Sequence, residues 1–179
     1  MIRQNWQMFH KGISDNMVDE IIKITGKTDE ASTFNNSGSD IRKSRVAWVD
    51  NQSVRNMLYE FVDIANTHAF HVHIYKKADI QYTEYLSSEQ GHYGLHHDID
   101  WQNNNGYDRK LSVTVQLSEP SEYEGGNFVF DEVDSPDTNI LKQKGTVLVF
   151  PSYLRHRVEP VTKGVRRSLV SWFEGPSWR

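Results

Sequence analysis

Three side chains that can bind a metal ion lie in two short segments of the chain. His96 and Asp98 form a His-x-Asp triplet, and His156 follows an apolar run that ends at Pro151. Two histidines and one carboxylate can occupy one face of an octahedral ion and leave the other face open, as in non-haem Fe(II) oxygenases. These residues therefore predict a metal site with open coordination positions.

An arginine pair follows the second segment. Arg166 and Arg167 precede Ser168 at the start of a predicted strand. A guanidinium group is a planar cation that can hold a carboxylate by two hydrogen bonds, so one of these arginines is expected to bind a cosubstrate that carries a carboxylate. Adjacent strand residues face opposite sides, so only one of the two can enter a pocket. Arg166, Ser168 and Trp172 share one face of this strand.

The elements that position these residues follow from the hydrophobic pattern. Ser14 or Asp15 can cap a first helix, and apolar residues at helical spacing predict a second helix over residues 51–68. From Phe70 onward the period changes to two, which predicts strands near 70–76, 79–85, 92–97, 110–118, 126–131, 145–150, 155–159 and 166–173. Helices followed by many short strands indicate an α+β fold whose main part is a β-sandwich or barrel. The form that fits best is a jelly roll that holds the metal at one open end.

One predicted strand, Leu111 to Leu117, alternates apolar odd positions with polar even positions. The pattern alone favours a half-buried strand with its polar face in solvent. Inside a barrel, the same face could line a wet pocket.

From Ile80 to Arg179 the chain resembles iron- and 2-oxoglutarate-dependent dioxygenases of the prolyl 4-hydroxylase type. The resemblance is carried by the segment from Tyr85 to Asp98, the turn Tyr123-Glu124-Gly125-Gly126, the run Gly145 to Phe150 before His156, and the segment Pro160 to Arg166. It implies a double-stranded β-helix core over about 70–179 with N-terminal supporting helices over about 1–69, in a single domain of residues 1–179. Arginine at position 166 resembles the hypoxia-sensor-like and the bacterial or viral members, whereas many collagen-type members have lysine there.

The resemblance also implies roles for individual residues. Fe(II) would be held by His96, Asp98 and His156, 2-oxoglutarate would be the cosubstrate, and O2 would be consumed. The residues that it places around 2-oxoglutarate are Arg166, Ser168, Tyr85, Tyr93, Thr114 and Gln116. The implied reaction is hydroxylation of a C–H bond of an acceptor, with release of succinate and CO2. Hydroxylation is favoured over halogenation because Asp98 fills the ligand position that a halogenase leaves open for halide.

The acceptor is expected to be a peptidyl proline. The polar loops Ile99 to Arg109 and Asp131 to Thr138 are expected at the mouth of the barrel, where loops set specificity. Trp101 and Tyr107 in the first loop are expected to contact the acceptor, although ordinary loop aromatics would show the same pattern. A small molecule or a nucleic acid is the alternative acceptor.

Composition excludes several classes of function. The chain has 179 residues, a net charge of −4 and no cysteine, which rules out disulfides, thiolate metal sites and a cysteine nucleophile. No apolar run approaches the roughly 18 residues of a membrane span and no signal peptide is evident, so a cytoplasmic protein without a membrane partner is expected.

Nucleic acid is not expected as a partner, because the chain is acidic and Trp172 stands where nucleic-acid demethylases carry a second arginine. A non-enzymatic, cupin-like metal-binding module would explain the metal residues but would not need Arg166. The sequence assigns no role to His71, His73, His92 or His97.

Overall fold

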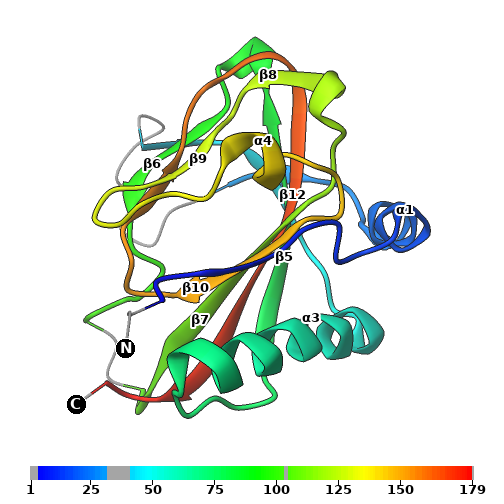
Figure 1. Ribbon diagram of the computed structural model, residues 1–179. Helices are drawn as coiled ribbons and strands as arrows, with labels where there is room; N and C mark the ends of the chain where they lie inside the picture. Colours follow the sequence, from blue (N-terminus) through cyan, green and yellow to red (C-terminus); the bar gives the residue numbers. More distant parts are fainter. Residues whose placement is uncertain (1–3, 32–40, 103–104, 179) are drawn as a thin grey trace.

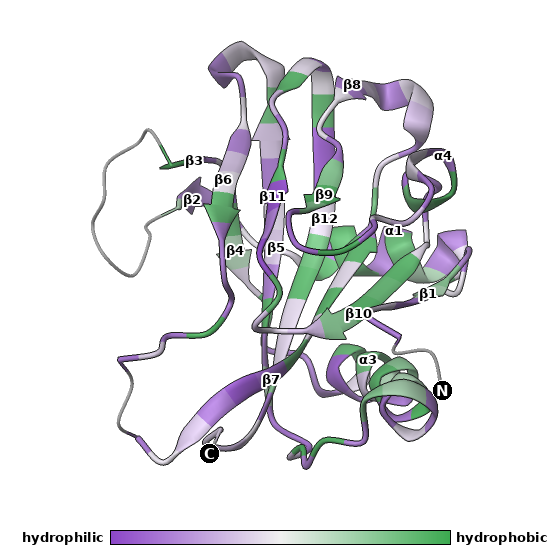
Figure 2. Cartoon of the chain, turned by 60° about the vertical axis from the view of Figure 1, so that its left-hand side comes forward, coloured by the Kyte–Doolittle hydropathy of each residue, from purple (hydrophilic) through white to green (hydrophobic). Residues whose placement is uncertain are grey.

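Two antiparallel sheets face each other, and helices cover the outer side of the larger sheet (Figures 1 and 2). The structure is a computed structural model that describes residues 4–31, 41–102 and 105–178. The larger sheet has the strand order β1-β10-β7-β12-β5-β4-β2, with β8 paired to β12. Its strands are β1 (Gln7–Phe9), β2 (Asp29–Glu30), β4 (Arg45–Trp48), β5 (Ala78–Leu86), β7 (Tyr107–Gln116), β8 (Tyr123–Gly125), β10 (Val147–Pro151) and β12 (Val161–Pro176).

The smaller sheet has four strands in the order β3-β6-β11-β9. They are β3 (Arg42–Lys43), β6 (His92–His96), β9 (Phe128–Phe130) and β11 (His156–Val158). Short 3-10 turns, Ser87–Glu89 and Pro120–Glu122, precede β6 and β8, and a short helix, α4 (Thr138–Leu141), precedes β10. Every strand pair in both sheets is antiparallel.

Two amphipathic helices pack on the outer face of the larger sheet. The helix α1 (Asp15–Ile24) begins after Ser14, whose hydroxyl accepts a hydrogen bond from the backbone N–H of Met17. The helix α3 (Gln52–Ala65) begins after Asn51 and continues into a π-helical turn, Asn66–Phe70. Their buried residues share one hydrophobic core with the sheet: Val18, Ile21, Val54, Leu58, Val62 and Ala65. Both predicted helices are confirmed.

The alternation in β7 divides its residues between two environments. Leu111, Val113 and Val115 belong to the core under the helices, while Ser112, Thr114 and Gln116 lie on the opposite face and are also buried. The solvent-facing interpretation of this polar face is therefore wrong, because the smaller sheet covers it.

The N-terminal part of the chain differs from the expected helical support. Besides its helices it contributes β1, β2 and β4 to the larger sheet and β3 to the smaller sheet. The strand predicted over 70–76 is also wrong. His71 has a left-handed backbone (φ 53°) that ends the π-helical turn, and the described residues that follow form no strand before Ala78. The predicted α+β class is confirmed.

Candidate metal centre

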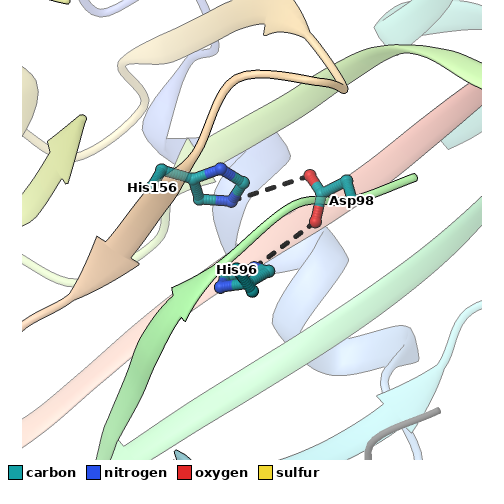
Figure 3. A group of neighbouring side chains, drawn as sticks. All are labelled: His96, Asp98 and His156. Atoms are coloured by element: carbon teal, nitrogen blue, oxygen red, sulfur yellow. Dashed lines mark ion pairs between the residues drawn. The ribbon is translucent and has the colours of Figure 1, made fainter. Parts of the chain in front are cut away.

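The three predicted metal ligands converge between the two sheets (Figure 3). His156 opens β11 and is the cross-strand partner of His96, the last residue of β6. Asp98 follows β6 directly, with Oδ1 3.4 Å from Nε2 of His96 and Oδ2 3.7 Å from Nε2 of His156. The ligand atoms of the three residues lie within 4.8 Å of one another. Antiparallel pairing thus joins two histidines that are far apart in the sequence.

Each histidine is oriented by the backbone carbonyl two residues before it in the chain. Nδ1 of His96 lies 2.8 Å from the carbonyl oxygen of Gly94, and Nδ1 of His156 lies 2.9 Å from that of Leu154. A carbonyl only accepts, so each Nδ1 carries the hydrogen and each Nε2 keeps a free lone pair. This is the tautomer that binds a metal through Nε2.

Two hydrogen bonds, one to its carboxylate and one from its backbone N–H, fix Asp98 in place. The hydroxyl of Ser112 on β7 donates to Oδ2 at 2.6 Å, and the backbone N–H of Asp98 donates to the carbonyl of Ser152 at 3.0 Å. Burial by itself would raise the pKa of Asp98, but the neighbouring His156 and His96 and the Ser112 hydrogen bond hold this pKa below its usual value. Burial lowers the pKa of His156 to about 4. Ionised aspartate and neutral histidine are the forms that bind a metal.

Aromatic rings pack against both histidines. Tyr93 stacks on His96 with ring centroids 3.5 Å apart, and Phe128 stacks on His156 with centroids 5.1 Å apart. The guanidinium of Arg42 lies 4.6 Å from the centre of the Tyr93 ring on β6. These contacts restrict rotation of both imidazole rings, so the donor set is held in place before any metal binds.

A cleft of about 190 Å³ extends from the triad between the sheets. One wall is the inner face of β5, β12 and β7, and the other comes from β6, β9 and β11. Its lining residues are Arg42, Trp48, Gln81, Tyr85, Tyr93, His96, His97, Asp98, Arg109, Thr114, Phe128, Phe150, His156, Val158, Arg166, Ser168, Val170 and Trp172.

Arg166 lies inside this cleft and Arg167 lies outside it. Arg166 is 2% exposed, its Nη1 is 3.4 Å from the hydroxyl oxygen of Ser168, and its guanidinium lies 5.4 Å from the centre of the Tyr85 ring. No carboxylate of a described residue forms an ion pair with it. Arg167, on the opposite face, pairs with Glu84 at 3.3 Å and Glu122 at 4.0 Å. The predicted alternation is confirmed, and the cleft contains a buried cation without a counter-charge.

The other predicted cosubstrate residues divide between two connected spaces. Tyr85, Tyr93, Thr114 and Ser168 line the cleft. Gln116 instead lines a smaller cavity that shares Arg166 and Phe128 with the cleft.

The two predicted acceptor contacts lie outside the wall of the cleft. Trp101 is 60% exposed. Tyr107 lines a neighbouring acidic pocket, which shares Asp98 and Arg109 with the cleft. Residues 103 and 104 of the same loop lie outside the described part of the chain.

Several cleft residues were not predicted to bind anything. Arg42 and Trp48 come from β3 and β4, which are too short to give a strand pattern. Gln81 is a polar residue in the alternating strand β5, and that position could have indicated the same inner face as Tyr85. Arg109 was expected at the end of the polar loop but lies on β7, and its guanidinium is 4.0 Å from the centre of the Trp172 ring.

The histidines without an assigned role lie in different places. His97 lines the cleft, and its Nδ1 is 2.7 Å from the carbonyl oxygen of Tyr153. His92 has Nδ1 2.8 Å from the carbonyl oxygen of Gln90. His73 packs edge-on against Tyr75, with ring centroids 5.7 Å apart.

The described helices include none that is both long and apolar enough to cross a lipid bilayer.

The sequence of the chain is similar to those of known oxygenases and hydroxylases. The family model described as the 2OG-Fe(II) oxygenase superfamily matches residues 80–174. A PKHD-type hydroxylase of Gloeothece citriformis is 40% identical over 82 residues, which are 46% of this chain and 37% of that relative. A PKHD-type hydroxylase of Crocosphaera subtropica is 30% identical over 131 residues, which are 73% of this chain and 54% of the relative. The chain thus spans 37% and 54% of the lengths of these two relatives.

Several solved structures with the same fold are prolyl hydroxylases. The collagen prolyl hydroxylase of Paramecium bursaria Chlorella virus-1, solved with 2-oxoglutarate, matches 96% of this chain and 97% of its own with a TM-score of 0.72 and 19% identity. A prolyl-4-hydroxylase of Pseudomonas putida matches 96% and 93% with a TM-score of 0.73 and 17% identity. A prolyl hydroxylase of Trichoplax adhaerens, solved with a peptide fragment of a hypoxia-inducible factor, matches 94% and 83% with a TM-score of 0.72 and 17% identity. The predicted double-stranded β-helix is confirmed.

Proposed function

The chain belongs to the 2OG-Fe(II) oxygenase superfamily, and from this membership we propose that it is an Fe(II)- and 2-oxoglutarate-dependent hydroxylase of a peptidyl acceptor, with proline as the first candidate. In the proposed reaction one oxygen atom of O2 enters a C–H bond of the acceptor, and the other enters succinate as 2-oxoglutarate loses CO2. His96, Asp98 and His156 would hold the iron.

The observation that carries this proposal is the buried, uncompensated charge of Arg166 in the same cleft as the triad. Leaving a guanidinium at 2% exposure without a counter-ion opposes folding, because desolvation penalises an unpaired charge. A ligand with a carboxylate would remove this penalty. A dicarboxylic 2-oxo acid that binds the metal at one end has a second carboxylate free for Arg166.

The chain's own residues would position the reaction and exclude water. Nε2 of both histidines and the carboxylate of Asp98 lie within 4.8 Å of one another, so they would hold iron through three protein ligands, a set that leaves coordination positions open to other ligands. Bound iron would supply the activation of O2 that no side chain can perform. Phe128, Phe150 and Val158 line the cleft with apolar surface, which limits the access of water to the metal.

The wall of the cleft also supports a peptidyl acceptor. The ring centroids of Trp172 and the exposed Trp48 are 6.3 Å apart, and the guanidinium of Arg109 stacks on the ring of Trp172. Aromatic planes suit a proline ring, and a guanidinium can donate to peptide carbonyls. The peptide bound to the Trichoplax adhaerens neighbour indicates the kind of acceptor to test first.

The test is turnover by the purified chain with Fe(II), 2-oxoglutarate and a library of proline-containing peptides. We expect succinate to form and a peptide to gain the mass of one oxygen atom, and we expect neither product with the Asp98→Ala variant. Stoichiometric metal binding without succinate formation under any condition would favour the cupin-like binding module instead. Succinate formation with modification of small molecules only would keep the chemistry and reject the peptide.

A further inference from the structure

Arg42 brings a cation into the cleft from the smaller sheet. It lies on β3, lines the cleft and is the cross-strand partner of Tyr93. Its guanidinium carbon is 4.6 Å from the centre of the Tyr93 ring, and that ring stacks on His96 with centroids 3.5 Å apart. One aromatic ring therefore separates this cation from a metal ligand, so an acceptor that reaches the metal must pass close to Arg42.

Two buried side chains hold the guanidinium of Arg42 in a fixed orientation. Nε donates to the hydroxyl of Ser44 and Nη2 donates to Oε1 of Gln81, each at 2.8 Å. Ser44 is 6% exposed and Gln81 is 5% exposed, so packing restricts both partners. Nη1 has no hydrogen-bond partner among the residues that the structure describes. Both partners are neutral, so they orient the cation without neutralising it.

The charges of the occupied cleft would leave Arg42 without a counter-ion. Fe(II) and Arg166 would together balance Asp98 and the two carboxylates of 2-oxoglutarate. Arg109 is the third arginine of the lining. Burial lowers its pKa, while Asp98 and two carboxylates of the neighbouring acidic pocket raise it, so Arg109 lies in an acidic environment. Arg42 differs, because no carboxylate in the described part of the chain forms an ion pair with it.

The chemistry of the cation indicates the chemistry of its ligand. A fixed guanidinium with a free N–H edge suits a carboxylate, which supplies both acceptor oxygens and the opposite charge. On a peptidyl acceptor this carboxylate is the side chain of an aspartate or a glutamate. Successive Cα atoms are about 3.8 Å apart, and Arg42 is one ring away from a metal ligand, so the acidic residue would lie within about two positions of the residue that reacts.

We propose that Arg42 binds an acidic side chain of the acceptor, within about two positions of the hydroxylated residue, and makes the protein selective for acidic target sequences. This inference rests on the proposed function and adds a charge requirement to the peptidyl acceptor. General attraction would give the opposite preference, because the chain has a net charge of −4 and repels acidic peptides. A preference for acidic peptides would thus come from a local cation.

The test compares three peptides by calorimetric titration of the whole chain loaded with 2-oxoglutarate and Mn(II), which occupies the site without supporting the reaction. Each peptide is acetyl-Ala-X-X-Pro-X-X-Ala-amide, where X is glutamate, glutamine or lysine, so the peptide ends carry no charge. The unmodified chain should bind the glutamate peptide about tenfold more tightly than the glutamine peptide, as expected for one charge-assisted contact. Salt at about 1 M should remove most of this preference.

Substitutions of Arg42 separate its charge from its packing. Arg42→Gln should bind the glutamate and glutamine peptides equally. Arg42→Glu should reverse their order, and the lysine peptide should bind this variant more tightly than it binds the unmodified chain. Arg45→Gln is the matched control, because Arg45 on β4 pairs with Glu89 at 2.6 Å and does not line the cleft. It removes the same charge and should leave the order of the peptides unchanged.

The outcomes separate this inference from the proposed function. Equal binding of the glutamate and glutamine peptides by the unmodified chain, or an unchanged glutamate preference in Arg42→Gln, would overturn the role of Arg42 and leave the proposed function standing. Loss of Mn(II) and of all three peptides alike by Arg42→Gln would also overturn it, since Arg42 would then only support Tyr93. If Arg42→Glu does not fold, the Arg42→Gln titration decides. If the unmodified chain binds none of the peptides, the peptidyl acceptor fails and this inference fails with it.

Discussion

Replacing Arg166 by methionine should strongly weaken cosubstrate binding and should not destabilise the ligand-free protein. Methionine has a similar stem length and is flexible enough to fill the same space. The variant therefore removes the charge and the hydrogen-bond donors with little change in packing. Most substitutions of a residue that is 2% exposed destabilise a protein, so this expectation is specific to a cation without a counter-charge.

The size of both effects follows from the surroundings of Arg166. Deleting one partner of a buried, charge-assisted pair costs about 2–5 kcal/mol, which is a loss of affinity of roughly 30-fold to several thousand-fold. In the ligand-free state the guanidinium has the hydroxyl of Ser168 at 3.4 Å and no ion-pair partner among the described residues. Replacing such a group by an apolar one is expected to range from neutral to about 2 kcal/mol stabilising.

The assay is chemical denaturation of the metal-loaded protein with and without saturating 2-oxoglutarate. A ligand that binds only the folded state raises the free energy of unfolding by an amount set by its concentration and affinity. The unmodified chain should gain stability from 2-oxoglutarate, and Arg166→Met should gain much less at the same concentration. Arg167→Met is the matched control, because Arg167 makes partly exposed ion pairs with Glu84 and Glu122 on the opposite face.

Two results would refute this reasoning. Equal stabilisation of Arg166→Met and the unmodified chain by 2-oxoglutarate would mean that the anchor is elsewhere. A ligand-free Arg166→Met that is several kcal/mol less stable would mean that Arg166 is compensated in the folded protein after all.

Three further predictions concern other parts of the site. Asp98→Ala should lose bound metal and turnover, because the two histidines that remain cannot set the facial geometry. A chelator should likewise remove turnover from the unmodified chain, and full metal content in the variant would refute the triad. Gly126→Ala should destabilise the fold by about 1–3 kcal/mol in denaturation and should also weaken 2-oxoglutarate binding, since its Cβ would lie 2.9 Å from both Cδ of Arg166 and Cγ2 of Val161. Trp101→Ala should lower the yield of hydroxylated peptide per succinate and leave peptide-independent succinate formation nearly unchanged; an equal fall in both rates would show that the Trp101 loop supports the metal instead of the acceptor.

Local patterns in the sequence were sufficient for the helices, most strands and the donor set. Helix starts at Ser14 and Asn51 depend on side chains a few residues away, and strand alternation is a property of each strand alone. Alternation also predicted that only one of Arg166 and Arg167 can enter the cleft, and the resemblance pointed to Arg166, which lines it. These features depend little on which strands become neighbours.

The strand predicted over 70–76 shows where alternation misleads. Val72 and Ile74 do pack against the core under the helices, so the apolar pattern was real. Their backbone, however, is held by single contacts, such as the N–H of Val72 to Oδ1 of Asn66 and the N–H of Tyr75 to the carbonyl of Glu174. An extended segment without a regular ladder has the same sequence pattern as a strand.

The opposite wall of the cleft could not be predicted, because it depends on pairing between distant segments. Arg42 enters the cleft since β3 pairs with β6, where Arg42 is the cross-strand partner of Tyr93. Neither β3, with two residues, nor β4, with four, has enough length for a periodic signal. The position of Tyr123 beside Arg166 has the same origin, because Tyr123 was visible in its turn motif but its orientation follows from the pairing of β8 with β12.

Strand register therefore matters more to this site than any single contact. Arg166 is the cross-strand partner of Tyr85, and Ser168 is the partner of both Thr83 and Gln116. A slip of β12 by one residue would turn Arg167 and Leu169 toward the cleft and Arg166 onto the opposite face of the sheet. The two halves of the site also belong to different sheets, with both histidines on the smaller sheet and Arg166 on the larger one. Asp98 connects them, because it follows β6 in the chain and accepts the 2.6 Å hydrogen bond from Ser112 on β7. The hydrogen bond thus ties the metal ligands to the larger sheet, which also carries Arg166. The distance between the ligand triad and Arg166 is therefore set by backbone pairing before any ligand binds.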